Sequence, residues 1–110
     1  MPFPSVVAEA DNRLYTASVR FEWDPRKAES NRRTHGVSFA EAVTVLEDDF
    51  ALTRDDPDAT QEARFVTLGL SAFGNLLVVV YTYRNADLIR LISAWRASKG
   101  QRKRYEEGRS

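Results

Sequence analysis

Three arginines around the predicted strands have the chemistry to bind a phosphate group. Arg64 begins one apolar run, Arg84 ends the next, and Arg90 lies inside the last. A guanidinium group donates two parallel hydrogen bonds to phosphate and keeps its charge at physiological pH. Each arginine taken alone is equally well explained as a strand-end charge paired with an acid. Their clustering with further cations favours a phosphate-binding face.

Positive charge is concentrated toward the C-terminus of a chain whose net charge is zero. Residues 84–104 hold seven basic residues and one acid, whereas residues 47–62 hold seven acids and one arginine. Such segregation indicates a basic working face and an acidic rim, although charged runs are often only solvated surface. Lys99 and Arg102 fall in the first turn of a predicted helix. A cation there costs about 0.3–1 kcal/mol at low salt, and a bound anion would offset that cost.

The candidates for proton transfer are fewer. His35 is the one side chain in the sequence that titrates near neutrality without help from its surroundings. Lys27, Asn31 and His35 are spaced four residues apart and share one face of a predicted helix. Cleavage of RNA without a metal would need a base, cations for the charge of the phosphorane, and an acid for the leaving oxygen. His35 is equally consistent with a cation placed favourably at a helix C-terminus, and Lys27 and Glu22 are weaker candidates.

The composition argues against several other kinds of site. The 110 residues include no cysteine and a single histidine, so disulfides, thiolate metal sites and histidine-rich metal sites are not expected. No apolar run approaches the roughly 20 residues of a membrane helix, and acids near the N-terminus argue against a signal peptide. No P-loop, dinucleotide fingerprint or nucleophilic triad is present. We therefore expect one cytoplasmic domain that needs no metal or cofactor.

Two helices are expected in the first half of the chain. Asp24 is a suitable N-cap for a helix that starts with Pro25 and ends at Gly36. This helix is almost wholly polar, so we expect it to present a surface. Residues 38–49 are predicted to form a second helix, whose apolar stripe should belong to the core. Residues 1–20 lack strong periodicity and are interpreted as a loose N-terminal extension with some local order.

Strands dominate the second half. A short strand and an acidic loop precede three apolar runs at residues 63–70, 76–83 and 88–95. Their connections are so short that the strands must form antiparallel hairpins. The middle run is almost continuously apolar and is expected at the centre of the sheet. Strict alternation in the last run places Arg90 and Arg96 on one face and Ser93 with Trp95 on the other.

A helix from about Ser98 to Glu107 closes the chain, with Ser98 and Gln101 at the spacing of a capping box. The elements together predict an α+β fold. In this fold two N-terminal helices and a C-terminal helix pack on an antiparallel β-sheet in meander order.

Four blocks of the sequence resemble the BrnT family of toxins. They read FEWDPRKAESNRRTHGVSFAEA, EARF, LLVVVYTYR and IRLISAWRASKGQRKRYEE, and they span residues 21–107 in the family's order. The resemblance implies a RelE-like ribonuclease fold and a type II toxin–antitoxin system, in which a metal-independent endoribonuclease cleaves messenger RNA and inhibits translation. It also implies neutralisation by a BrnA-type antitoxin, whose ribbon-helix-helix domain would bind operator DNA. Residues 1–20 would precede this toxin domain, and residues 108–110 would follow as a tail.

The resemblance also implies roles for individual residues. We expect Arg64, Arg84 and Arg90 to bind the phosphate and Ser93 to position it by a hydrogen bond. His35 and Lys27 complete the expected catalytic set. The residues expected to contact the remainder of the RNA are Trp95, Arg96, Lys99, Arg102 and Lys103.

Two residues depart from the family pattern. Trp95 stands where the family commonly has an arginine, and Gln101 where it has a glutamate. Arg96 would replace that arginine only if a β-bulge turned it to the other face. Trp95 itself would stack on a base, a contact worth roughly 1–3 kcal/mol. The alternative function is therefore an attenuated toxin-like module retained for antitoxin binding and operon repression.

Overall fold

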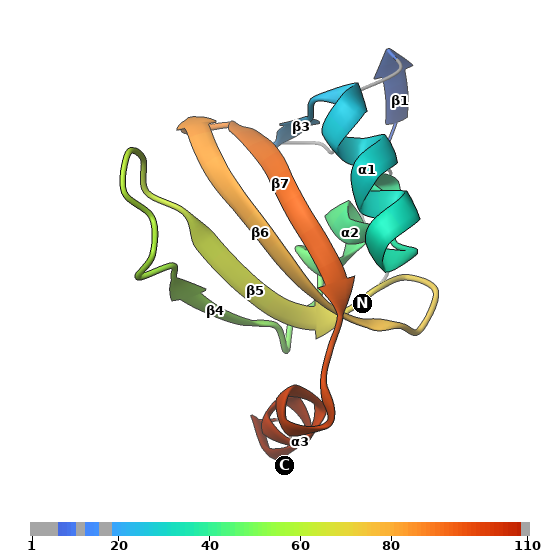
Figure 1. Ribbon diagram of the computed structural model, residues 1–110, viewed down its shortest axis with the longest axis vertical. Helices are drawn as coiled ribbons and strands as arrows, with labels where there is room; N and C mark the ends of the chain where they lie inside the picture. Colours follow the sequence, from blue (N-terminus) through green and yellow to red (C-terminus); the bar gives the residue numbers. More distant parts are fainter. Residues whose placement is uncertain (1–6, 11–12, 16–18, 109–110) are drawn as a thin grey trace.

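The computed structural model describes residues 7–10, 13–15 and 19–108. The described residues form three helices and one seven-stranded sheet (Figure 1). Much of residues 1–20, which we interpreted as a loose extension, lies outside the described residues, but the backbone of two short strands at the edge of the sheet comes from it. The elements are β1 (Val7–Ala10), β2 (Arg13–Tyr15), β3 (Arg20–Glu22), α1 (Pro25–His35), α2 (Phe39–Val45), β4 (Leu52–Asp55), β5 (Phe65–Leu70), β6 (Leu76–Asn85), β7 (Leu88–Arg96) and α3 (Lys99–Gly108).

The sheet is mixed, which corrects the expectation of a purely antiparallel one. Its strand order is β1-β2-β3-β7-β6-β5-β4, and β4 to β7 form the expected antiparallel meander. The difference is β3, which pairs in parallel with β7. A parallel pair needs a long crossover between its strands, and the segment containing α1 and α2 begins that crossover. In the antiparallel meander β7 is an edge strand. β3 pairs with part of this edge and buries Phe21 beside Ile89.

The helix ends follow local capping signals. The Asp24 side chain accepts a hydrogen bond from the backbone N–H of Arg26, and α1 ends at Gly36 with a left-handed φ of 70°. These observations confirm the predicted limits of the first helix. The second is shorter than expected, because α2 ends at Val45 and not near residue 49. At the start of α3, Ser98 and Gln101 exchange the two hydrogen bonds of a capping box, as predicted. Of the predicted tail, Gly108 belongs to α3, and residues 109–110 lie outside the described residues.

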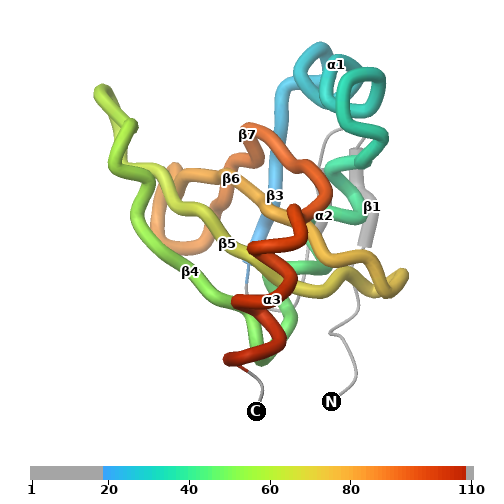
Figure 2. The backbone as a smooth tube through the Cα atoms, turned by 60° about the horizontal axis from the view of Figure 1, so that its bottom comes forward, coloured from blue at the N-terminus to red at the C-terminus, as the bar shows by residue number. Residues whose placement is uncertain are grey.

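The two faces of the sheet are covered to different extents. We call the face under α1 and α2 the covered face; on it alternate residues of β6, including Leu77 and Val79, are fully buried in the main core. We call the opposite face the open face. There α3 packs against β5 (Figure 2), and Tyr105 closes a smaller cluster with Leu68, Leu76 and Val78. β6 is buried on both faces over most of its length, as the sequence predicted for a central strand.

A bulge in β7 corrects the predicted alternation. Val80 pairs with Ser93 and Tyr81 pairs with Leu91, so Ile92 is the extra residue in β7. Beyond it the side chains change faces. Ser93 and Trp95 therefore join Arg90 on the open face, and Arg96 turns to the covered face. Strict alternation had separated Arg90 from Ser93 and Trp95, because an extra residue leaves no periodic signal in a run of apolar residues.

Candidate functional site

The open face carries three rows of side chains that cross the sheet in register. Rows lie two residues apart along each strand, about 7 Å at ~3.3 Å per residue. The first row contains Thr82 and Arg90, and continued alternation from Val66 assigns Arg64, just before β5, to the same row. The second row contains Arg54, Val66, Val80 and Ser93, and the third contains Leu52, Leu68, Val78 and Trp95.

The three predicted phosphate-binding arginines differ in their partners. Arg90 donates to Glu22 at 2.8 Å, and the Arg90 side chain is 34% exposed. Arg84 lies 3.7 Å from Glu62, and its side chain is more exposed than that of Arg90, at 48%. Arg64 is half-buried, and its guanidinium makes no ion pair with the described residues. Arg64 is therefore the arginine of this set that could bind an anion without first leaving a carboxylate.

The predicted helix face of Lys27, Asn31 and His35 turns toward β7. Lys27, His35 and Ser93 line a cavity of about 300 Å³ between α1 and β7. The His35 and Trp95 rings lie 6.1 Å apart, measured between their centroids. The structure thus brings His35 and Lys27 to the end of the second row, next to Ser93. Both side chains are exposed, and water or a substrate can reach them.

Asn31 is a further functional candidate. The sequence predicted that it shares a helix face with Lys27 and His35 but assigned it no role. It is 7% exposed. Its side-chain amide donates to the carbonyl oxygens of Val37 and Ala94 at 3.0 and 2.8 Å, and its oxygen accepts from the Ala94 N–H at 3.0 Å. Asn31 thus serves as a strand partner for β7 beyond the end of β3. Ser93 Oγ donates to the same oxygen at 3.2 Å, so Asn31 also orients the Ser93 hydroxyl. The signal available in the sequence was its spacing of four residues from both Lys27 and His35.

The predicted RNA-binding residues do not form a single patch. Trp95 is half-buried in the smaller cluster near α3. Arg96 is directed to the covered face, where it donates to Asn75 Oδ1 at 3.1 Å, so the bulge does not bring it to the face that carries Trp95. The remaining three are exposed on α3, namely Lys99, Arg102 and Lys103.

Two arginines that the sequence analysis did not select also face this surface. Arg54 lies in the second row, and Arg104 projects from α3 toward it. α3 is held in place by Tyr105, whose hydroxyl donates to Asp48 Oδ2 at 2.6 Å. Arg54 lay in the acidic stretch, where its charge was outnumbered, and only the register of β4 shows which face it occupies.

The two tyrosines of β6 have different positions. Tyr81 belongs to the main core, and burial raises the pKa of its hydroxyl, which shares a hydrogen bond with Thr67 at 2.8 Å. Tyr83 is exposed and contacts Phe65 edge to face. Tyr81 is therefore a structural residue.

These features define an α+β protein whose mixed sheet keeps one face partly open and lines it with guanidinium groups. Residues 23–101 match the family described as "Ribonuclease toxin, BrnT, of type II toxin-antitoxin system". The chain belongs to this family, which implies an RNA substrate and an antitoxin partner.

A solved structure supports the fold. The crystal structure of the Brucella abortus ribonuclease toxin BrnT aligns with a TM-score of 0.53 and 22% identity, over 70% of this chain and 94% of that one. At this identity the likeness bears on the fold alone. No curated protein matches the chain. Among the described residues, no helix is long and apolar enough to span a membrane, and no three acidic or histidine side chains are grouped to hold a metal ion.

Proposed function

We propose that this protein is a toxin that cleaves messenger RNA and thereby inhibits translation in the cytoplasm. The observation that carries the proposal is the placement of Arg64, Arg90 and Ser93 on one open sheet face. An RNA strand lying along this face would meet guanidinium groups at its phosphates. The toxin domain is proposed to span residues 21–107 with a RelE-like arrangement.

In this proposal the protein supplies charge and proton transfer, and no metal takes part. The 2′-hydroxyl attacks the adjacent phosphorus, a new P–O bond forms, and the bond to the 5′-oxygen of the next nucleotide breaks. Arg64 and Arg90 stabilise the negative charge of the phosphorane, with Arg84 at the edge of the site. His35 or Lys27 exchanges protons with the attacking and leaving oxygens. Ser93 donates its hydroxyl hydrogen to a phosphate oxygen, which replaces Asn31 Oδ1 as the acceptor.

The partner in the silent state is proposed to be a BrnA-type antitoxin. Its ribbon-helix-helix domain would bind operator DNA, and the complex would repress its own operon. The open face is proposed as the surface that the antitoxin covers. Its exposed cations, including Lys99, Arg102 and Lys103, would pair with acidic groups of that protein.

An attenuated module is the second candidate function, and specific contacts favour it. Arg84 and Arg90 already pair with Glu62 and Glu22, and the Ser93 hydroxyl is already bonded to Asn31. Trp95 stands where the family commonly has an arginine. If the first candidate fails, the variant Trp95→Arg should gain cleavage activity.

The test is cleavage of a defined messenger RNA by the purified full chain, once with magnesium ions and once with EDTA. Wild type is compared with Arg64→Ala and with Arg26→Gln, a matched loss of an exposed arginine on α1. We expect cleavage by wild type and Arg26→Gln but not by Arg64→Ala, with unchanged circular dichroism for all three. Intact RNA with folded wild-type protein would reject the proposed ribonuclease and support the attenuated module. Cleavage that stops in EDTA would reject metal independence alone.

A further inference from the structure

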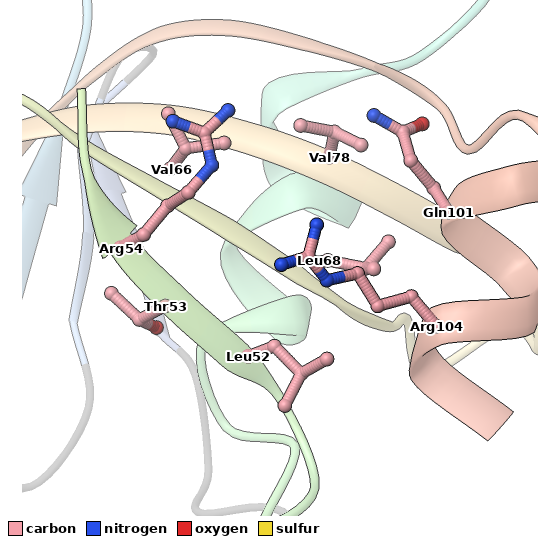
Figure 3. Close-up of a pocket in the computed structure, with 8 residues that line it drawn as sticks. All are labelled: Leu52, Thr53, Arg54, Val66, Leu68, Val78, Gln101 and Arg104. Carbon is pink, nitrogen blue, oxygen red and sulfur yellow. The ribbon is translucent and has the colours of Figure 1, made fainter. Parts of the chain in front are cut away.

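A groove separates β4 from α3 on the open face (Figure 3). Its volume is about 250 Å³. The floor is apolar and continues the third row of side chains. Figure 3 shows the guanidinium groups of Arg54 and Arg104 projecting over this floor, one from the strand and one from the helix. The residues that form the floor are Leu52, Val66, Leu68 and Val78.

The two arginines of the groove have no carboxylate partner among the described residues. Arg54 donates to the backbone carbonyl of its neighbour Asp55 at 3.2 Å, and no ion pair or hydrogen bond of the Arg104 side chain occurs within the described part of the chain. Both side chains are exposed. Two like charges on facing walls repel each other, and an anion between them would convert that repulsion into attraction. The groove therefore combines an apolar floor with two positive charges that no described carboxylate neutralises.

A nucleotide has both of these properties in one molecule. Its base offers a flat apolar surface for the floor, guanidinium planes stack on bases, and its phosphate accepts bidentate hydrogen bonds from arginine. The groove has the room of about eight water molecules at ~30 Å³ each, which suits a single base better than an extended peptide. It also leads into the second and first rows, about 7 Å and 14 Å away along the strands. An RNA strand seated here would continue toward Ser93 and Arg90.

We propose that this groove binds one nucleotide of the RNA strand, with the base on the Leu52, Leu68 and Val78 floor and the phosphate between Arg54 and Arg104. The identification of RNA as the biological ligand rests on the proposed ribonuclease function. Binding of a nucleotide does not require cleavage, so the groove can be tested separately.

The experiment is methyl NMR of the full chain labelled at Leu and Val. The probes are the four ribonucleoside 5′-monophosphates, with inorganic phosphate and ribose 5-phosphate as controls. We expect the nucleotides to shift the methyl resonances of Leu52, Leu68 and Val78, while the two controls leave them nearly unchanged. The methyls of Val79, on the covered face, should not respond to any probe.

Two variants test the role of the arginines. The double substitution Arg54→Gln with Arg104→Gln should weaken nucleotide binding by about tenfold or more, because charge-assisted hydrogen bonds are lost. Arg26→Gln removes one exposed arginine far along the chain on α1 and should bind as wild type does. Both substituted groove residues are exposed, so the methyl spectrum should still report a folded core.

Three outcomes would overturn the proposal. These are no shift of the groove methyls at the highest nucleotide concentrations, an equally strong shift with inorganic phosphate, and unchanged nucleotide binding by the double variant. Silence toward nucleotides with a response to an acidic peptide of the antitoxin would make the groove a protein interface. Nucleotide binding in a protein that leaves RNA intact would uphold the groove and reject the ribonuclease. RNA cleavage with identical products by wild type and the double variant, with no methyl shift on addition of nucleotides, would uphold the ribonuclease and reject the groove.

Discussion

The covered and open faces of the sheet use the same strands for different purposes. On the covered face, Leu77 and Val79 are fully buried beneath α1 and α2. The side chains of the intervening strand residues point to the open face. At one end of that face they pack under α3, and at the other end arginine side chains are accessible to solvent. Residues that stabilise the fold and residues proposed to act on RNA therefore alternate along the same strands and lie on opposite faces of the sheet. Substitutions on the two faces should affect different measurements.

The largest expected effect is on the open face. Arg64→Ala removes a guanidinium that has no carboxylate partner among the described residues, and we expect the rate of RNA cleavage to fall by about 10²–10³-fold. Stability should hardly change, because no described ion pair is lost. Single-turnover cleavage and urea unfolding measure the two quantities. A variant that loses stability and activity together would show that Arg64 belongs to the framework.

The next largest effect is on the covered face. Leu77→Ala should lower the free energy of unfolding by about 2–5 kcal/mol, since it leaves a cavity in the main core. The matched control is Leu52→Ala on the open face, where the side chain is 37% exposed and the loss should be well under that of Leu77→Ala. Urea unfolding of both variants checks the difference. Equal losses would contradict the division of labour between the faces.

Asn31 connects the two regions, and its replacement should have an intermediate effect. Asn31→Ala leaves the Ala94 N–H and carbonyl without a partner at the edge of β7, which should cost about 1–3 kcal/mol. The same change releases the Ser93 hydroxyl, so the rate of cleavage should change in the protein that remains folded. Hydrogen exchange of the Ala94 amide reports the local loss. Ser30→Ala, on the exposed side of the same helix, is the control, and equal exchange rates in both variants would exclude the edge-partner role.

The smallest effect concerns pH. Burial raises the pKa of Tyr81 above its ordinary value of 10.0, so the folded state favours the neutral hydroxyl. The associated stability is fully present below pH 10 and is lost as the pH rises through the raised pKa of the folded state. Tyr81→Phe should make stability less dependent on pH in that range. Urea unfolding at neutral pH and above pH 10 tests this, with Tyr83→Phe as the exposed control that should behave as wild type.

The sequence predicted those features that depend on neighbouring residues. Asp24, Gly36 and Ser98 mark helix ends because capping bonds join residues at most a few positions apart. The central position of β6 followed from its continuous apolar run. The limits of the second helix were less accurate, since the turn after Val45 has no strong stop signal.

The features that the sequence could not predict depend on pairing between distant segments. The parallel pairing of β3 with β7 joins residues more than sixty positions apart. The bulge at Ile92 changed the face of every later residue in β7, including Trp95. The groove of Arg54 and Arg104 exists because β4 and α3 meet on one face. None of these leaves a periodic trace in the chain.

The sequence by itself determined the α+β class, both ends of the first helix, the start of the last helix, the central strand and the family resemblance, because propensity, capping and apolar periodicity act over short stretches. It also supplied the arginines and the single histidine. Only the tertiary structure decided that Arg64, Arg90 and Ser93 share one face, and that Asn31 completes the edge of β7. The physical reason is that the register and bulge of a sheet are set by hydrogen bonds between strands, and these join residues that the linear sequence keeps far apart.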